Sequence, residues 1–142
     1  MKTQPDAAPE GFRAIQALSP FNELVGPLYE RRQAGQELCV GLRIEKKHTN
    51  SRGICHGGVL ATLADLSLGY AMHVKLEAHT SYVTAHLAVD YAGAAKVGDW
   101  VESVVEIQRV GARLAFANCY LVSAGRRLVR ASAIFARADR EK

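Results

Sequence analysis

The chain has 142 residues, of which 49% are hydrophobic and 23% are charged, and its formal net charge is +4 at pH 7. This length suits one globular domain, and the composition supports a sizeable core and excludes wholesale disorder. The mild positive charge favours an anionic ligand. Because no aromatic residues are interleaved with the arginines, we expect no nucleic-acid partner.

The cysteines and the longest apolar stretch bear on the cellular compartment. Cys39, Cys55 and Cys119 are odd in number and scattered, and residues 1–10 hold no apolar targeting core. These features predict reduced thiols in a cytoplasmic protein. Residues 59–72 are interrupted by polar side chains and are shorter than the roughly 20 residues that span a bilayer, so we expect no association with a membrane.

The N-terminal segment differs in composition from the rest of the chain. All four prolines lie within residues 1–27. We interpret residues 1–24 as an extension with a short helix that places Phe12 and Ile15 on one face, and residues 25–140 as the main domain. The proline-free remainder suits interior strands, in which every backbone N–H is needed for the hydrogen-bond ladder.

The hydrophobic periodicity changes twice along the main domain. Residues 36–46 alternate with a period of two and predict a strand, residues of about 57–73 have a helical pattern, and three or four strands follow. In the first of these later strands we place five residues on one face: Val83, Ala85, Leu87, Val89 and Tyr91. In the last strand one face holds Val129, Ala131, Ala133 and Phe135, opposite Arg130 and Ser132.

This order of elements predicts an architecture. A single helix that is apolar nearly all round must be covered on most of its sides. The economical arrangement is a curved antiparallel sheet wrapped around that one long central helix. We therefore expect an α+β fold in which the helix of about 57–73 is the inner element.

A glycine pair stands at the predicted start of this helix, in His56-Gly57-Gly58. The first backbone N–H groups of a helix have no partner within it, carry the positive end of the helix dipole, and are unshielded where no Cβ is present. Such a position suits a carbonyl oxygen that becomes an oxyanion during acyl transfer. Taken alone, the pair is more simply explained as a glycine-rich turn that lets the chain bend sharply.

A single carboxylate, Asp65, interrupts the apolar helix. At 100° per residue it shares a face with Gly58, Ala61, Thr62 and Gly69, all of them small. A lone carboxylate in an apolar helix is costly to bury and needs either a partner or a function. Both explanations stay open, because Thr62 or a second chain could also satisfy Asp65. The opposite face, expected to be core, holds Leu60, Leu63, Ala64, Ser67, Tyr70 and Ala71.

Other candidate groups carry weaker signals. Cys55 beside His56 suggests a thiolate nucleophile, but adjacent side chains in an extended turn usually point apart. The five histidines include no i,i+4 helical pair and no Cys-x-x-Cys companion, so we expect no metal site. Several arginines are candidates for contact with phosphate groups, although each is equally consistent with a solvated strand edge. They are Arg109, Arg113, Arg126, Arg127 and Arg130.

The passage from residue 48 to residue 65 resembles a known family. The motif is His48-x-Asn50-x-x-Gly53-x-x-His56-Gly57-Gly58, followed after seven residues by Asp65. It is similar to the phenylacetate-pathway (PaaI-like) branch of the hotdog-fold thioesterases, within the 4-hydroxybenzoyl-CoA thioesterase superfamily. The resemblance continues through Thr84-x-x-Leu87-x-Val89-x-Tyr91 and covers roughly residues 25–138. It implies the hotdog fold, whose sheet and central helix match the expected architecture.

The resemblance also implies roles for the matching residues. The Gly57 N–H would polarise the thioester carbonyl, and Asp65, contributed across a dimer interface, would act as general base on water or as the nucleophile itself. Asn50 and His56 would shape the turn. Thr84 matches a position where the family often has Ser or Thr to position the attacking water. We assign substrate binding to Gly58, Thr62 and Arg113.

The function implied is hydrolysis of an acyl-CoA thioester without a metal or redox cofactor, since CoA is part of the substrate. We expect a homo-oligomer, either a dimer or a dimer of dimers, because the small-residue face and the sheet edge both lack a partner. Two alternatives stay open. A hotdog hydratase or dehydratase would show an Asp-to-His spacing that this chain lacks, and a non-catalytic acyl-CoA-binding module would not need Asp65. The acyl group itself is not specified.

Overall fold

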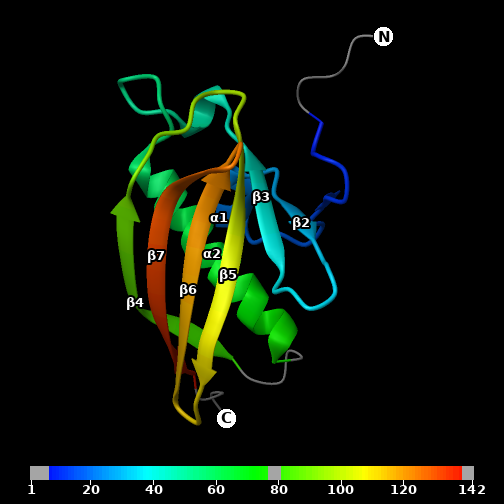
Figure 1. Cartoon of the computed structure of the whole chain (residues 1–142), viewed down its shortest axis with the longest axis vertical. Helices are drawn as coiled ribbons and strands as arrows, with labels where there is room; N and C mark the ends of the chain where they lie inside the picture. The colour runs from blue at the N-terminus through cyan, green and yellow to red at the C-terminus, as the bar shows by residue number, and fades with distance from the viewer. Residues whose placement is uncertain (1–6, 77–80, 139–142) are drawn as a thin grey trace.

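The computed structural model describes residues 7–76 and 81–138 (Figure 1). Seven strands form one antiparallel sheet in the order β1-β2-β3-β5-β6-β7-β4. The strands are β1 (Arg13–Ala14), β2 (Tyr29–Arg31), β3 (Cys39–Arg43), β4 (Tyr82–Tyr91), β5 (Trp100–Val110), β6 (Leu114–Ser123) and β7 (Arg126–Arg137). The helices are α1 (Pro20–Val25), the short 3-10 helix η1 (Lys46–His48) and α2 (Gly57–Lys75).

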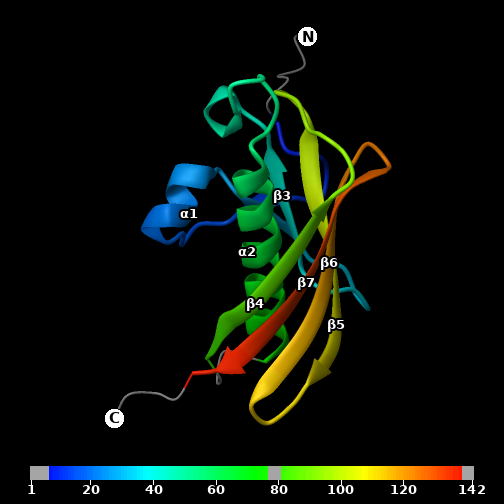
Figure 2. The same ribbon diagram turned by 90° about the vertical axis from the view of Figure 1, so that its left-hand side faces the viewer.

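The long helix α2 lies along one face of the curved sheet, and α1 lies on the side of α2 away from the sheet (Figure 2). This arrangement confirms the predicted hotdog architecture. The helix begins at the expected residue and ends at Lys75, two residues later than predicted. In the described part of the chain, no helix is both long and apolar enough to cross a membrane.

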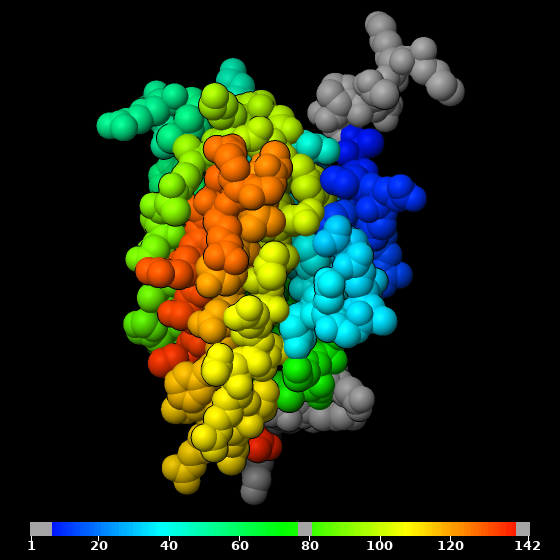
Figure 3. All heavy atoms as spheres, in the orientation of Figure 1, coloured from blue at the N-terminus to red at the C-terminus, as the bar shows by residue number. Residues whose placement is uncertain are grey.

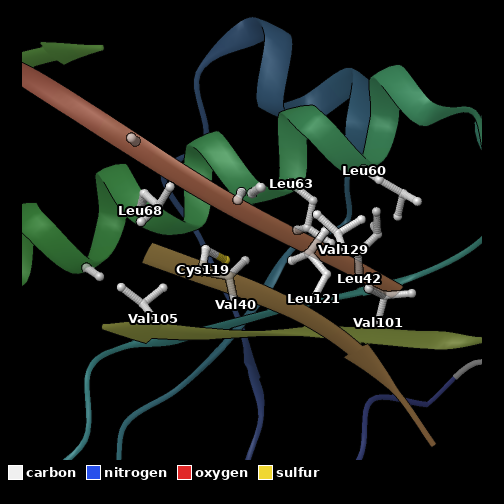
Figure 4. Close-up of a cluster of buried hydrophobic side chains, with 14 of the residues drawn as sticks. Val40, Leu42, Leu60, Leu63, Leu68, Val101, Val105, Cys119, Leu121 and Val129 are labelled. Atoms are coloured by element: carbon white, nitrogen blue, oxygen red, sulfur yellow. The ribbon is translucent and has the colours of Figure 1, made fainter. Parts of the chain in front are cut away.

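The core forms where α2 meets the sheet (Figure 4). Leu60, Leu63 and Leu68 of α2 are at most 2% exposed and face Val40, Val101, Leu121 and Val129 of the strands. Burying a leucine side chain contributes about 1.5–3 kcal/mol, so these residues fix the rotation of α2 against the sheet. The predicted core face is confirmed except at Tyr70, which is only partly buried.

The alternation predicted for the last strand is confirmed in β7, whose four apolar residues are buried. The prediction for β4 is wrong in its first half. A register shift lies between Thr84 and His86, so that Thr84 pairs with Phe135 and His86 with Ile134, leaving Ala85 as the extra residue of a bulge. The bulge reverses the alternation, which leaves Val83 54% exposed and turns Thr84 toward α2.

The N-terminal segment also departs from expectation. Residues 13 and 14 form β1, which pairs with β2, so the helix expected to carry Phe12 and Ile15 is absent there. The helix of this segment lies later, at α1, where the Ser19 side chain caps the first turn. Figure 3 shows the first described residues, in dark blue, and the β2–β3 hairpin, in cyan, packed side by side along the β5 side of the sheet.

An indole ring ties this N-terminal segment to the sheet. Phe12 meets Trp100 edge to face with ring centroids 4.9 Å apart, and Tyr29 packs on the same ring at 5.5 Å. The ring lies directly over Gly41 of β3, where an added Cβ would be 2.1 Å from the indole Cζ2. Gly41 is therefore required by close approach and not by backbone conformation.

We predict that Gly41→Ala destabilises the fold by about 1–3 kcal/mol, the usual cost of overpacking, because the indole must move. Chemical denaturation measures the loss. The same substitution should cost less in a Trp100→Leu background, because the smaller side chain leaves room for the added methyl group. The comparison is between Trp100→Leu alone and Trp100→Leu with Gly41→Ala. Equal stability of Gly41→Ala and the parent chain would show that the position of the Trp100 ring does not require a glycine at residue 41.

Candidate active site

The turn before α2 is held by backbone hydrogen bonds around a buried histidine. The Nδ1 atom of His48 accepts from the Glu45 N–H at 2.9 Å, so its Nε2 carries the proton and donates to the Val25 carbonyl. The His48 carbonyl in turn accepts from the His56 N–H at 2.8 Å. These contacts place the residue before Gly57 with little freedom.

Asn50 shapes the neighbouring loop. Its N–H donates to the Ile54 carbonyl at 2.8 Å, its carbonyl accepts from the Gly53 N–H at 3.0 Å, and its side-chain oxygen accepts from the Arg52 N–H. Gly53 has a φ of +75°, a conformation that glycine adopts at low cost. Asn50 thus supports the loop through local bonds, and no contact joins it to Asp65 in the described residues.

His56 caps the N-terminus of α2. Its Nδ1 accepts from the Gly58 N–H at 2.8 Å, and its carbonyl accepts from the N–H groups of Val59 and Leu60. Within the described part of the chain, the Gly57 N–H has no acceptor. That N–H lies at the positive end of a helix of 19 residues, where it suits an oxygen that gains negative charge.

Tyr91 packs against the same glycine. Its hydroxyl donates to the Gly57 carbonyl at 2.7 Å, and an added Cβ at Gly57 would lie 3.3 Å from the tyrosine ring. Sequence reasoning placed Tyr91 on a strand face and gave it no role at the site. The contact joins residues 34 positions apart, so no local pattern could have predicted it.

Asp65 and Thr84 form the second half of the candidate site. The Thr84 hydroxyl donates to Asp65 Oδ1 at 2.8 Å, which holds the carboxylate and leaves its other oxygen for a further contact. Asp65 is half-buried and borders a hollow of about 450 Å³ between α2, β4 and α1. Sequence reasoning named both residues, and the bulge in β4 brings them together.

The remaining predicted residues lie in different places. Gly58 is in the first turn of α2, and its carbonyl accepts from the Thr62 hydroxyl at 2.9 Å. Thr62 bonds to this helix backbone and not to Asp65. Arg113 lies in the hairpin between β5 and β6, at the end of the sheet opposite the start of α2 (Figure 1). Its assignment to substrate binding stays a prediction.

Burial makes the three thiols poor nucleophiles. Loss of solvation raises the pKa of Cys55 to about 11, of Cys39 to about 11 and of Cys119 to about 12. Near neutral pH each thiol is almost entirely protonated, and a thiol reacts as its thiolate. In the described residues, no group of three His, Cys, Asp or Glu side chains is placed to hold a metal ion.

Residues 52–130 match the family model of the thioesterase superfamily. The chain belongs to this superfamily and is a hotdog-fold thioester hydrolase. It is 44% identical over 127 residues to a Pseudomonas aeruginosa protein that is named as an esterase, covering 89% of this chain and 95% of that protein. It is 31% identical over 90 residues to mouse acyl-coenzyme A thioesterase 13, covering 63% and 64%.

Solved structures agree with this placement. A mutant form of the phenylacetic acid degradation protein PaaI from Thermus thermophilus superposes with a TM-score of 0.75 at 25% identity, covering 84% of this chain and all of that one. The TT0310 protein from the same organism gives a TM-score of 0.76, also at 25% identity, with 86% and 100% covered. The PaaI-like resemblance is therefore confirmed.

The cap on α2 can be tested directly. We predict that His56→Ala lowers the free energy of unfolding by about 0.5–2 kcal/mol, because the Gly58 N–H loses its acceptor. His56→Asn keeps a side-chain acceptor at the cap and should recover most of this loss. Denaturant titration of the two variants gives the comparison. Equal destabilisation by Ala and Asn would show that capping is not the role of His56.

Proposed function

We propose that this protein hydrolyses an acyl-CoA thioester to a carboxylic acid and CoA, with Asp65 and the Gly57 N–H as the catalytic groups. The observation that carries the proposal is the pairing of Thr84 with Asp65 beside an open hollow. The mouse relative that is named as an acyl-coenzyme A thioesterase supports CoA as the thiol component. CoA is then part of the substrate, and the hydrolysis itself needs no further cofactor.

In the proposed reaction the thioester carbonyl oxygen accepts from the Gly57 N–H. Asp65, held through Oδ1 by Thr84, takes a proton from water as the water oxygen bonds to the carbonyl carbon. The helix dipole and the Gly57 N–H stabilise the negative charge that develops on the carbonyl oxygen. The C–S bond then breaks, and the CoA sulfur leaves as a thiolate that takes up the proton that Asp65 had accepted, which returns Asp65 to its carboxylate form. Direct attack by the Asp65 carboxylate would instead form an anhydride that water hydrolyses.

One chain does not hold a complete site. Gly57 and Asp65 are eight residues apart on α2, which corresponds to about 12 Å along the helix axis. A thioester carbon must lie within roughly 3–3.5 Å of its attacking group while its oxygen meets the N–H donor. We therefore propose that Asp65 acts opposite Gly57 of the partner subunit, in a dimer or a dimer of dimers.

The sheet offers an edge for this assembly. The ten-residue strand β4 is the last in the sheet order and carries Thr84, whereas the strand at the other edge has only two residues. A long edge strand presents unpaired backbone groups that invite a second strand. A two-fold contact along β4 would extend the sheet and set the two α2 helices side by side. The buried free thiols suit a reducing compartment such as the cytoplasm.

The role of the carboxylate gives a first test. We predict that Asp65→Asn keeps the fold and oligomeric state but lowers kcat by about 10²–10⁴-fold, the usual loss on removing a general base. A CoA-release assay with a thiol-reactive dye measures the rate, and Cys55→Ala serves as a control that should keep activity. An Asp65→Asn enzyme that assembles correctly and turns over normally would contradict the assignment.

A hybrid experiment tests the shared site. Gly57→Ala pushes a methyl group against the Tyr91 ring and should lower kcat by about 10²–10³-fold through displacement of the oxyanion donor. In a random mixture of Asp65→Asn and Gly57→Ala chains, half of the dimers are hybrids with one intact site each. Activity should therefore return to about a quarter of the parent value if the site is shared.

Subunit exchange must be verified by mass spectrometry of isotope-labelled chains before the rates are compared. Each variant measured alone must show its own low rate under the same conditions. Hybrids that form and remain inactive would place both catalytic groups in one subunit, which the spacing along α2 argues against.

A further inference from the structure

The hollow beside Asp65 continues along α2. A second hollow of about 130 Å³ shares Gly69, His73, Tyr82 and Phe135 with the larger one and extends to Leu76. Together they form a groove, here called the chamber, that starts at Asp65 and runs toward the C-terminal end of the helix. Its total size lies in the range of small-molecule sites, and the aromatic side chains of Tyr82 and Phe135 form part of its wall.

A glycine in the floor of the chamber is not explained by packing within the chain. Gly69 stands in the middle of α2, where glycine is the poorest helix former except for proline. An added Cβ at this position would meet no atom of the described residues within 4 Å. Gly41 provides the contrast, because there a Cβ would collide with the indole of Trp100. The space above Gly69 is open on the side of the chamber.

The position of Gly69 relates it to the reacting group. Gly69 follows Asp65 by four residues, so it lies on the same face of the helix about 6 Å further along the axis. The carbon attacked near Asp65 would lie about 3–3.5 Å from the attacking group. The methyl group of an acetyl thioester is only one bond beyond that carbon, so it extends less far over Gly69 than a longer acyl group does. A longer or wider acyl group directed into the chamber would pass over it.

We propose that Gly69 is a specificity-determining residue that keeps the chamber open for a bulky apolar acyl group. This inference rests on the proposed function, since it takes Asp65 as the reacting end of the chamber. It assigns the substrate class as thioesters whose acyl part extends several carbons past the carbonyl, such as hexanoyl or benzoyl, over acetyl. Glycine at this position lowers the stability of the helix but leaves room for the substrate.

The test is Gly69→Ala, which adds one methyl group to the floor. The values of kcat/KM for acetyl-CoA, hexanoyl-CoA and benzoyl-CoA are compared in the parent and the variant. We expect acetyl-CoA to change less than twofold, while the two bulkier substrates lose about tenfold or more, because a methyl group that takes space needed by the acyl group discriminates by about that factor. The thermal midpoint should stay the same or rise, since alanine is the better helix former.

Ser67→Ala is the matched control. Ser67 is buried on the core side of α2, and its hydroxyl has no hydrogen-bond partner among the described residues. The substitution also strengthens the helix but adds nothing to the chamber, so it should leave the ratio of rates for hexanoyl-CoA and acetyl-CoA unchanged. A similar change of ratio in Ser67→Ala would assign the effect to the stiffness of α2 and overturn the proposal.

Two further outcomes also decide the matter. If Gly69→Ala lowers all three substrates equally and dissociates the oligomer in size-exclusion chromatography, Gly69 serves a contact between subunits and the proposal is wrong. If it changes no substrate, the chamber does not hold the acyl group. Asp65→Asn, measured in parallel, separates these results from failure of the catalytic assignment. A normal rate in that variant together with altered selectivity in Gly69→Ala would reject the base and retain the chamber.

Discussion

The spacing of two groups on one rigid helix constrains the whole proposed mechanism. A helix of 19 residues cannot bend enough to bring Gly57 to Asp65, since its backbone hydrogen bonds fix the rise between them. In the proposed mechanism the N-terminal end supplies a donor and the middle supplies a carboxylate, so each helix would contribute to two sites and complete neither. Assembly would then be a condition for chemistry and not only a source of stability. The sheet contributes by holding α2 straight and by presenting β4 at its edge.

The two halves of the candidate site are built in different ways. The turn at Gly57 is ordered by local hydrogen bonds of His48 and His56 and by distant contacts with Val25, Ala95 and Tyr91. Such preorganisation matters because a donor that must reorient during the reaction stabilises the transition state less. Asp65 depends on tertiary structure instead, since its partner Thr84 comes from a strand 19 residues away. The carboxylate is oriented only after β4 has joined the sheet.

Much of this arrangement could be predicted from the sequence, and the exceptions have physical causes. The helix and the alternation in β7 follow from the period of the hydrophobic residues. The pairing of Gly57 with Asp65 as catalytic groups is implied by the family resemblance and stays a prediction. The helix proposed around Phe12 failed because contacts with Trp100 and pairing with β2 outweigh a short periodic signal. Tyr91 and the chamber were missed because both arise from residues that meet only after folding. Periodicity describes one element at a time and carries no information about such contacts.

The bulge at Ala85 makes the residue count of β4 part of the site. Upstream of the bulge, Tyr82 and Thr84 face the helix, and downstream Leu87 and Val89 do. Removing one residue there would reverse which side chains face the helix upstream of the deletion. The Thr84 hydroxyl would then point to the outer face, although Thr84 itself is unchanged. Substitutions in this stretch alter one side chain, whereas single-residue insertions or deletions exchange the two faces. A sequence alignment of this strand therefore has to place its gaps so that inward-facing positions match inward-facing positions. An alignment made by residue identity alone could pair an inward hydroxyl with an outward one.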